Sequence, residues 1–296
     1  MLSSNKETST PNLFARCHLS LLVLDMFKLI LQKKSFSTMQ TIVTTIQHRP
    51  YVMAFLLVFF VLAILHLGIF RALIWLIWGY AVAFVSEYSS IRNGFPYGLY
   101  HYVYENLQGE LLIGGVPVWD SASYAFIAYA SFATAWFFLE PNFLKFSIDP
   151  HVSPSRPLAV VLLGSILMMV ADMIIDPVAN LGEKWFLGKI YYYPEGGLYF
   201  GVPVSNFLGW LLVAFVIIAG FQILEKFLFI KAKLPVWGAK RFPLQALLGP
   251  LFYFGILKFN LWITLQVEAY KLFAVSLGMT LVILGFVIRR LRQPSF

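Results

Sequence analysis

Charge is scarce in this chain. Only 12% of the 296 residues are charged, and Asp and Glu together number 14. A soluble domain carries about 25% charged residues, so an ordinary soluble fold is excluded. The net charge of +8 does not indicate a nucleic-acid partner. The Lys and Arg residues flank apolar runs, as they do in the cytoplasmic loops of membrane proteins.

Cysteine is almost absent as well. Cys17 is the single cysteine, which excludes an internal disulfide and any cysteine-based metal cluster. The histidines are scattered, without the spacing of metal ligands. They are His18, His48, His66, His101 and His151. We therefore expect no metal site, and the reaction considered below requires no cofactor.

Long apolar runs are what the chain has instead. Hydrophobic residues make up 59% of it, and the mean hydropathy is +0.76. Several runs reach about 20 residues, enough to cross a bilayer as a helix. We predict an all-α, polytopic membrane protein of the plasma membrane with about seven spans, although six or eight also fit. The expected spans are 51–70, 72–86, 122–139, 158–176, 204–224, 243–265 and 272–288.

The first 38 residues differ from the rest. A polar start is followed by an apolar stretch, 13–31, which charged residues interrupt. This stretch is no complete span, and it lacks the cleavage site of a signal peptide. Residues 1–38 are either an interfacial helix or an extension from a start codon assigned too early, with Met39 as the true start. We therefore divide the chain into an extension, 1–38, and a helical membrane domain, 39–296.

The distribution of Lys and Arg does not decide how the chain is oriented in the membrane. Counted from Met39, more Lys and Arg lie on the side of the C-terminus, mainly within 226–241 and 289–292. This bias favours a cytoplasmic C-terminus. If residues 1–38 are included, the two sides tie, so both orientations stay open.

Two acids lie in the fourth apolar run. Asp172 and Asp176 are four residues apart, so a helix places them on one face. Carboxylates inside an apolar span usually face the bundle interior and mark a functional site. Asp176, before Pro177, can instead simply end a helix at the interface. Glu87, which is expected to close the second span, can likewise be interfacial.

A pattern of an acid, a Gly- and Tyr-rich loop, Gly-Val-Pro-Val and a helix occurs twice. The first copy comprises Glu87, 93–102 and 115–118; the second comprises Asp172, Asp176, 191–199 and 201–204. Two spans separate the copies, so both loops should lie on one side of the membrane. A parallel repeat with its site between the copies is a known plan of membrane proteins. A chance match in a chain rich in Gly, Val and Pro is the alternative.

Several of these motifs carry a family resemblance. They are Glu87, 97–102 (YGLYHY), 115–118 (GVPV), Asp176-Pro177 and 199–210 (YFGVPVSNFLGW). They resemble the membrane carotenoid biosynthesis protein family, which includes the CruF-type carotenoid 1',2'-hydratases and the bisanhydrobacterioruberin hydratases. The resemblance covers about 51–288. It implies addition of water to the terminal 1',2' double bond of an acyclic (ψ) end group, giving a tertiary alcohol. It also implies a hydrophobic carotenoid substrate in the lipid bilayer, with other carotenoid-pathway enzymes as candidate partners.

The chemistry of such a reaction points to the acids. An alkene is a poor base, so hydration needs a protonated acid in a dry site, and water then captures the tertiary cation. Burial and a nearby carboxylate both favour the protonated form of a carboxylic acid. We expect one of Asp172 and Asp176 to be the acid and the other to stay ionised and orient water, with Glu87 as a third catalytic candidate.

Aromatic side chains can stabilise the cation. The candidate substrate-binding residues are Tyr100, Tyr102, Trp119, Tyr199, Asn206 and Trp210. Some Trp and Tyr residues of a membrane protein simply belong to the interfacial belts. Asn206 and Trp210, four residues apart, can also serve helix–helix packing.

Three other functions compete. A proton-coupled transporter also buries acids at repeated positions. A membrane carotenoid (lycopene-type) cyclase uses the same protonation and cation, but it loses a proton instead of adding water. A retinal-binding protein would need a lysine deep in the last helix, whereas Lys271 lies at the start of that helix.

Overall fold

Long helices dominate the protein, as the sequence predicts. The computed structural model describes residues 38–139, 158–185, 187–240 and 242–292. Within these ranges, seven helical segments are long and apolar enough to cross a membrane. Their helices are α2 (Pro50–Leu67), α3 (Ile69–Asn93), α4 (Val118–Leu139), α5 (Leu158–Ala179), α6 (Val204–Glu225), α7 (Leu248–Gln266) and α8 (Tyr270–Arg292). The all-α fold class is confirmed. The proposed extension, 1–38, lies outside the described residues except for its last position.

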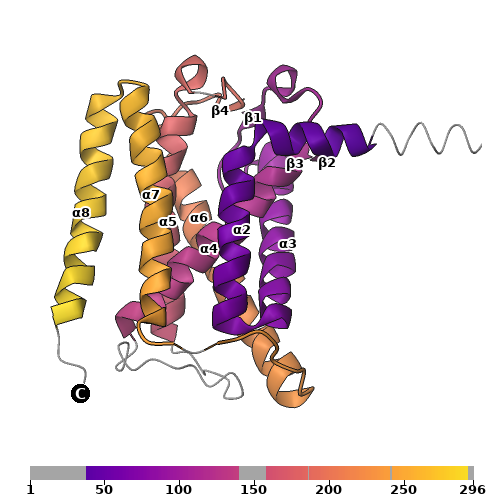
Figure 1. The fold of residues 1–296 in the computed structure, drawn as a ribbon. Coiled ribbons are helices and arrows are strands. Elements are labelled where there is room, and N and C mark those ends of the chain that lie inside the picture. The colour runs from indigo at the N-terminus through magenta and orange to yellow at the C-terminus, as the bar shows by residue number, and fades with distance from the viewer. Residues whose placement is uncertain (1–37, 140–157, 186, 241, 293–296) are drawn as a thin grey trace, which may run out of the picture.

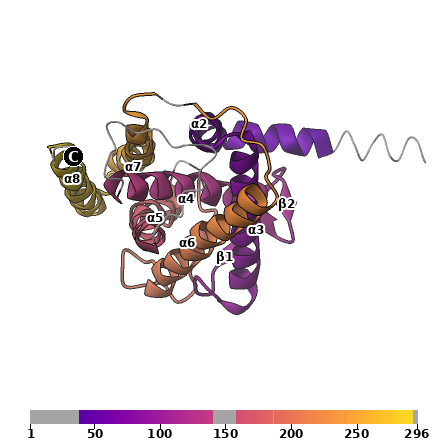
Figure 2. The same cartoon turned by 90° about the horizontal axis from the view of Figure 1, so that it is seen from below.

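Helix α4 forms the centre of the bundle and is the most deeply buried of the spans. It packs against α2, α3, α5 and α7, while α8 lies at the edge beside α7 and α5 (Figures 1 and 2). Small residues on α4 let its neighbours approach closely. A Cβ at Gly249 of α7, for example, would come within 2.7 Å of the Ala133 backbone. The packing around α4 therefore depends on backbone proximity.

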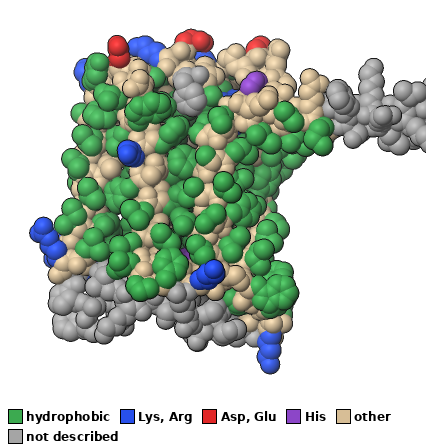
Figure 3. All heavy atoms as spheres, in the orientation of Figure 1, with side chains coloured by type: hydrophobic (Ala, Val, Ile, Leu, Met, Phe, Trp, Pro, Cys, Tyr) green, Lys and Arg blue, Asp and Glu red, His purple; other side chains and the backbone are tan. Residues whose placement is uncertain are grey.

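The outer surface fits a lipid environment. On the face shown in Figure 3, hydrophobic side chains cover the sides of the helices, and charged side chains gather mainly toward the two ends. Exposed apolar residues such as Leu57, Ile77 and Leu281 belong to this surface. Apolar area facing outward along the spans is expected when the surrounding solvent is the hydrocarbon core of a bilayer.

Several predicted helix boundaries are wrong. The break between the first two spans lies at Gly68, whose φ of +86° favours glycine, and not at Arg71. Arg71 instead lies within α3, buried, and its Nε is 2.8 Å from Glu225 Oε1. An ion pair of this kind lets a charged residue stay inside an apolar bundle.

Three further boundaries move toward the loops. Helix α3 continues to Asn93, so Glu87 lies inside the helix instead of closing it. Helix α5 runs through Pro177 to Ala179, so Asp176 does not end it. Helix α4 begins at Val118, four residues earlier than predicted. Polar residues in the added turns of α3 and α4 hid those helix ends from a hydropathy criterion, and Pro177 suggested an end to α5 that the structure does not have.

The two Gly- and Tyr-rich loops meet at one end of the bundle, opposite the C-terminus (Figure 1). Strand β1 (His101–Tyr102) pairs antiparallel with β4 (Tyr191–Tyr192), which places Tyr102 opposite Tyr191. Strand β2 (Leu112–Ile113) pairs with β3 (Val116–Pro117) in the first loop. The prediction that both loops lie on the same side is therefore correct. A helix formed by 38–48 lies across the same end of the bundle.

Candidate functional site

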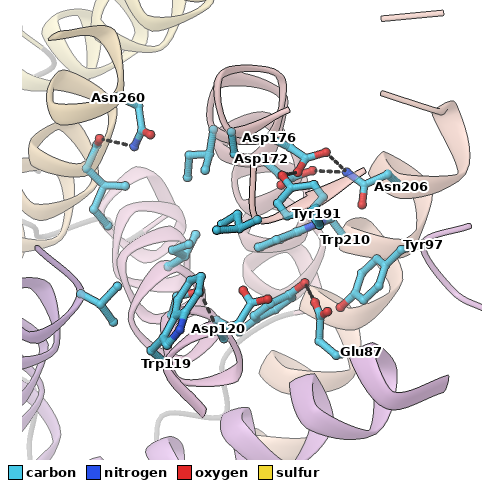
Figure 4. A pocket seen from close by; sticks show the side chains of 18 of the residues that line it. Glu87, Tyr97, Trp119, Asp120, Asp172, Asp176, Tyr191, Asn206, Trp210 and Asn260 are labelled. Carbon is cyan, nitrogen blue, oxygen red and sulfur yellow. Dashed lines mark hydrogen bonds between the residues drawn. The ribbon is translucent and has the colours of Figure 1, made fainter. Parts of the chain in front are cut away.

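A cavity of about 120 Å³ lies beneath these loops. Most of its lining is aromatic or apolar, from α2, α4, α5, α6 and α7 and from the loops. Four carboxylic acids also line it: Glu87, Asp120, Asp172 and Asp176 (Figure 4). A concave, mainly apolar site with a few convergent polar groups is the usual form of a small-molecule site.

Asp172 and Asp176 lie on one face of α5, as their spacing predicts. The side-chain amide of Asn206, at the start of α6, bridges them. Its Nδ2 donates to Asp172 Oδ2 at 2.7 Å and to Asp176 Oδ2 at 3.2 Å. The Tyr193 hydroxyl donates to Asp176 Oδ2 at 2.9 Å, and the Tyr191 hydroxyl donates to Asp176 Oδ1. Asp176 thus accepts three hydrogen bonds from side chains, and Asp172 accepts one.

Glu87 and Asp120 form a second pair, joined by Tyr102. The Tyr102 hydroxyl lies 3.0 Å from Glu87 Oε2 and is also hydrogen-bonded to Asp120 Oδ2. Glu87 Oε1 accepts a hydrogen bond from the Tyr124 hydroxyl. Glu87 is buried and Asp120 is partly buried. The cavity therefore has two carboxyl pairs, each with its own hydrogen-bonding partners.

Aromatic rings separate and surround these pairs. Tyr124 stacks on Trp210 with ring centroids 4.2 Å apart and 12° between the planes.

Burial raises the pKa of four tyrosines well above the usual value: Tyr97, Tyr102, Tyr191 and Tyr193. These hydroxyls therefore keep their protons at neutral pH, and those of Tyr102, Tyr191 and Tyr193 are hydrogen-bonded to carboxyl groups of the site.

Most of the predicted site residues converge. Those that line the cavity are Glu87, Asp172, Asp176, Tyr100, Trp119, Asn206 and Trp210. Tyr102 is not in the lining, but its hydroxyl is hydrogen-bonded to Glu87 and Asp120, which are. Tyr199 lies outside the cavity, where its ring packs edge-on against Phe200 and Phe207. The tight backbone bridge between Tyr199 and Val202 sets that direction.

Trp119 has a second role. Its Nε1 donates to Glu110 Oε2 at 2.5 Å, and the Arg49 guanidinium lies 4.3 Å from the centroid of its ring. Arg49 also forms a buried two-point ion pair with Glu110, at 2.7 and 3.1 Å. This cluster ties the first loop to the start of α4 and to the N-terminal side of α2.

Sequence reasoning missed Asp120, Tyr124, Tyr191 and Tyr193. The predicted third span began at Ala122, which left Asp120 in a loop. A signal was nevertheless present, because Asp120 follows Gly-Val-Pro-Val by two residues, as Asn206 does in the second copy. Tyr124 and Trp210 also occupy matching positions, four residues further on. Matching the two copies position by position would have found both residues.

The contacts support the internal repeat. Glu87 precedes its donor Tyr102 by 15 residues, and Asp176 precedes its donor Tyr191 by 15 residues. Tyr102 and Tyr191 are themselves paired across β1 and β4. Equivalent residues of the two copies thus face one another around the cavity.

Among the residues that the structure describes, no group of three or more His, Cys, Asp or Glu is arranged to hold a metal ion. The carboxyls are instead hydrogen-bonded to tyrosine hydroxyls and to one amide.

Comparison with known proteins gives one result. The family model described as carotenoid biosynthesis protein matches residues 48–284, a range that includes every residue of the cavity lining. No curated protein and no solved structure matches the chain. Since the matched range covers most of the 296 residues, the chain belongs to the carotenoid biosynthesis protein family.

Proposed function

We propose that the protein hydrates the terminal 1',2' double bond of an acyclic carotenoid end group, producing a tertiary alcohol. The observation that carries the proposal is the Asp172–Asp176 pair, bridged by Asn206 and facing an aromatic cavity. Membership of the carotenoid biosynthesis family supplies the substrate class. The reaction then takes place within the cell membrane, where such a substrate dissolves.

The hydrogen bonds favour different roles for the two aspartates. Hydrogen bonds donated to a carboxylate stabilise its ionised form. Asp176 accepts three of them, whereas Asp172 accepts one and is 1% exposed. We therefore assign the acid to Asp172 and the ionised partner to Asp176. This arrangement separates two chemically identical groups by their surroundings, as in other enzymes that use paired carboxyls.

In the first step, the Asp172 carboxyl proton moves to the less substituted carbon of the double bond. The π electrons form the new C–H bond, and the more substituted carbon becomes a tertiary cation. Tyr124 and Trp210 line the cavity, and aromatic faces attract cations. The ionised Asp176 adds electrostatic stabilisation in a site with little water.

In the second step, a water oxygen bonds to the cation and loses a proton to a carboxylate of the site. The sum is one water added, with no electron transferred. The apolar part of the cavity, lined by Phe55, Ile127, Ile256 and Phe259, suits the branched hydrocarbon end of the substrate. A cavity of about 120 Å³ suits the end of a long polyene.

The test is expression of the full chain in a bacterium that makes lycopene, followed by chromatography and mass spectrometry of the pigments. We expect a more polar product heavier by one or two waters. A product with the mass of lycopene and new rings would identify a cyclase instead. Unchanged pigment, with the protein present in the membrane, would contradict an enzymatic role on this substrate.

A further inference from the structure

The proposed function leaves the second carboxyl pair unused. Glu87 and Asp120 line the same cavity as Asp172 and Asp176. In Figure 4, the rings of Tyr191 and Trp210 lie between the two pairs. A reaction that both delivers and removes a proton has a use for acids at two separate positions.

The repeat indicates that the second pair belongs to the site. Glu87 and Asp176 are equivalent, because each is hydrogen-bonded to a tyrosine 15 residues later. Asp120 is equivalent to Asn206, but it bears a carboxyl group where Asn206 bears an amide. The second copy has its extra carboxyl at Asp172, and the equivalent position in the first copy does not carry an acid. The same scaffold therefore carries two acids in each copy, and one acid of each copy has no acidic counterpart in the other.

The Glu87–Asp120 pair differs from the Asp172–Asp176 pair in sharing a single hydroxyl proton, that of Tyr102. A phenolic hydroxyl has one proton to donate and can also accept. Tyr102 lies in hydrogen-bond contact with Glu87 and with Asp120, so it can donate to only one of them. The other contact is satisfied when that carboxyl is protonated and donates to Tyr102. Both contacts of Tyr102 are therefore satisfied when one carboxyl of the Glu87–Asp120 pair is protonated and the other is ionised.

We propose that Glu87 and Asp120 form the proton-accepting half of the site, with Asp120 as the group that orients the attacking water. This inference rests on the proposed function. As the water oxygen bonds to the cation, its proton moves to the ionised carboxyl of the pair, and Tyr102 turns its own proton toward the carboxyl that remains ionised. The ionised Asp172 and the protonated pair then exchange one proton through water before the next turnover. Protons and electrons balance, and no other reactant is needed.

The experiment uses Asp120→Asn in the full chain, in membranes that contain lycopene and heavy water. Two quantities are measured: the alcohol formed, and deuterium at the less substituted carbon in recovered alkene. We expect alcohol formation to fall by about 10²–10⁴-fold, the usual value of general acid–base catalysis. Deuterium should still enter the alkene, because the cation forms and returns a proton to Asp172. Asp172→Asn should abolish both signals, and Asp120→Glu should restore part of the alcohol.

Ser121→Ala is the matched control. Ser121 adjoins Asp120 on α4, is fully buried, does not line the cavity, and its hydroxyl has no hydrogen-bond partner among the described residues. The inference would be overturned if Asp120→Asn formed alcohol at a rate within about twofold of that of the unchanged protein. So would loss of both alcohol and deuterium in Asp120→Asn at normal protein levels. No alcohol from the unchanged protein would instead overturn the proposed function itself.

Discussion

Tyr124 stacks on Trp210 at 4.2 Å, and these two rings occupy the same position in the two copies of the repeat. Each follows its Gly-Val-Pro-Val motif by six residues and lies one helical turn after a polar cavity residue, Asp120 or Asn206. The centre of the site is therefore the contact between two equivalent helix starts. The matching positions in the two copies bring aromatic rings and carboxyls to one cavity.

Replacement of Trp210 by an aliphatic residue should slow the reaction more than replacement of its indole by a phenyl ring. A cation–π contact is worth about 0.5–2 kcal/mol, which is about 2- to 30-fold in rate. Trp210→Leu should lose that factor in turnover, whereas Trp210→Phe keeps an aromatic face and should lose less. Both are measured as alcohol formed per folded protein. Equal rates for the two variants would show that the ring does not act on the cation.

Asn206 should stabilise the fold as well as the site. Its amide is the shared donor for Asp172 and Asp176, and Asn206→Ala leaves both buried carboxyls with one donor fewer. An unsatisfied buried polar group costs about 1–3 kcal/mol. We expect a lower melting temperature in detergent and little alcohol. Asn206→Asp is the second variant, since it keeps the size of the side chain but replaces the donor amide by a third acid. Unchanged activity in that variant would rule out a role for Asn206 as hydrogen-bond donor to the two aspartates.

The Arg49–Glu110 pair should stabilise the site end of the bundle. Both side chains are buried, and loss of one partner of a buried ion pair costs about 3–5 kcal/mol. Glu110→Gln and Arg49→Met should each lower the melting temperature. The double variant Arg49→Met/Glu110→Leu should recover part of the loss, because no charge then remains unpaired. Additive losses in the double variant would contradict this reading of the pair.

A chain that begins at Met39 should insert and act like the full chain. Residues 1–38 carry no complete span and no residue of the motifs that repeat in the chain. The measurement is alcohol formed per membrane-inserted protein, for the shortened and the full chain in the same cells. Loss of activity at normal membrane levels would assign a role to the segment.

Hydropathy was enough to predict seven spans, because long apolar runs have few alternatives in lipid. It could not place the ends of α3 and α4, where polar residues such as Glu87 and Asp120 continue the helix into the cavity. Asp172 and Asp176 were predictable from their four-residue spacing. The partners of Asp176 were not, because Tyr191 and Tyr193 reach it only through the pairing of β1 with β4. Tyr199 belongs to the same aromatic loop, yet its backbone bridge turns it away from the cavity.

The central claim is that Asp172 supplies the proton, and Asp172→Asn tests it most directly. The amide keeps the size of the side chain and can still contact Asn206, but it has no acidic proton to give. Measured in heavy water with lycopene as substrate, this variant should reach normal membrane levels yet form no alcohol and incorporate no deuterium. Asp176→Asn should also lose alcohol, because its charge would be gone. Near-normal alcohol formation by Asp172→Asn would contradict the account and leave Glu87 as the leading acid.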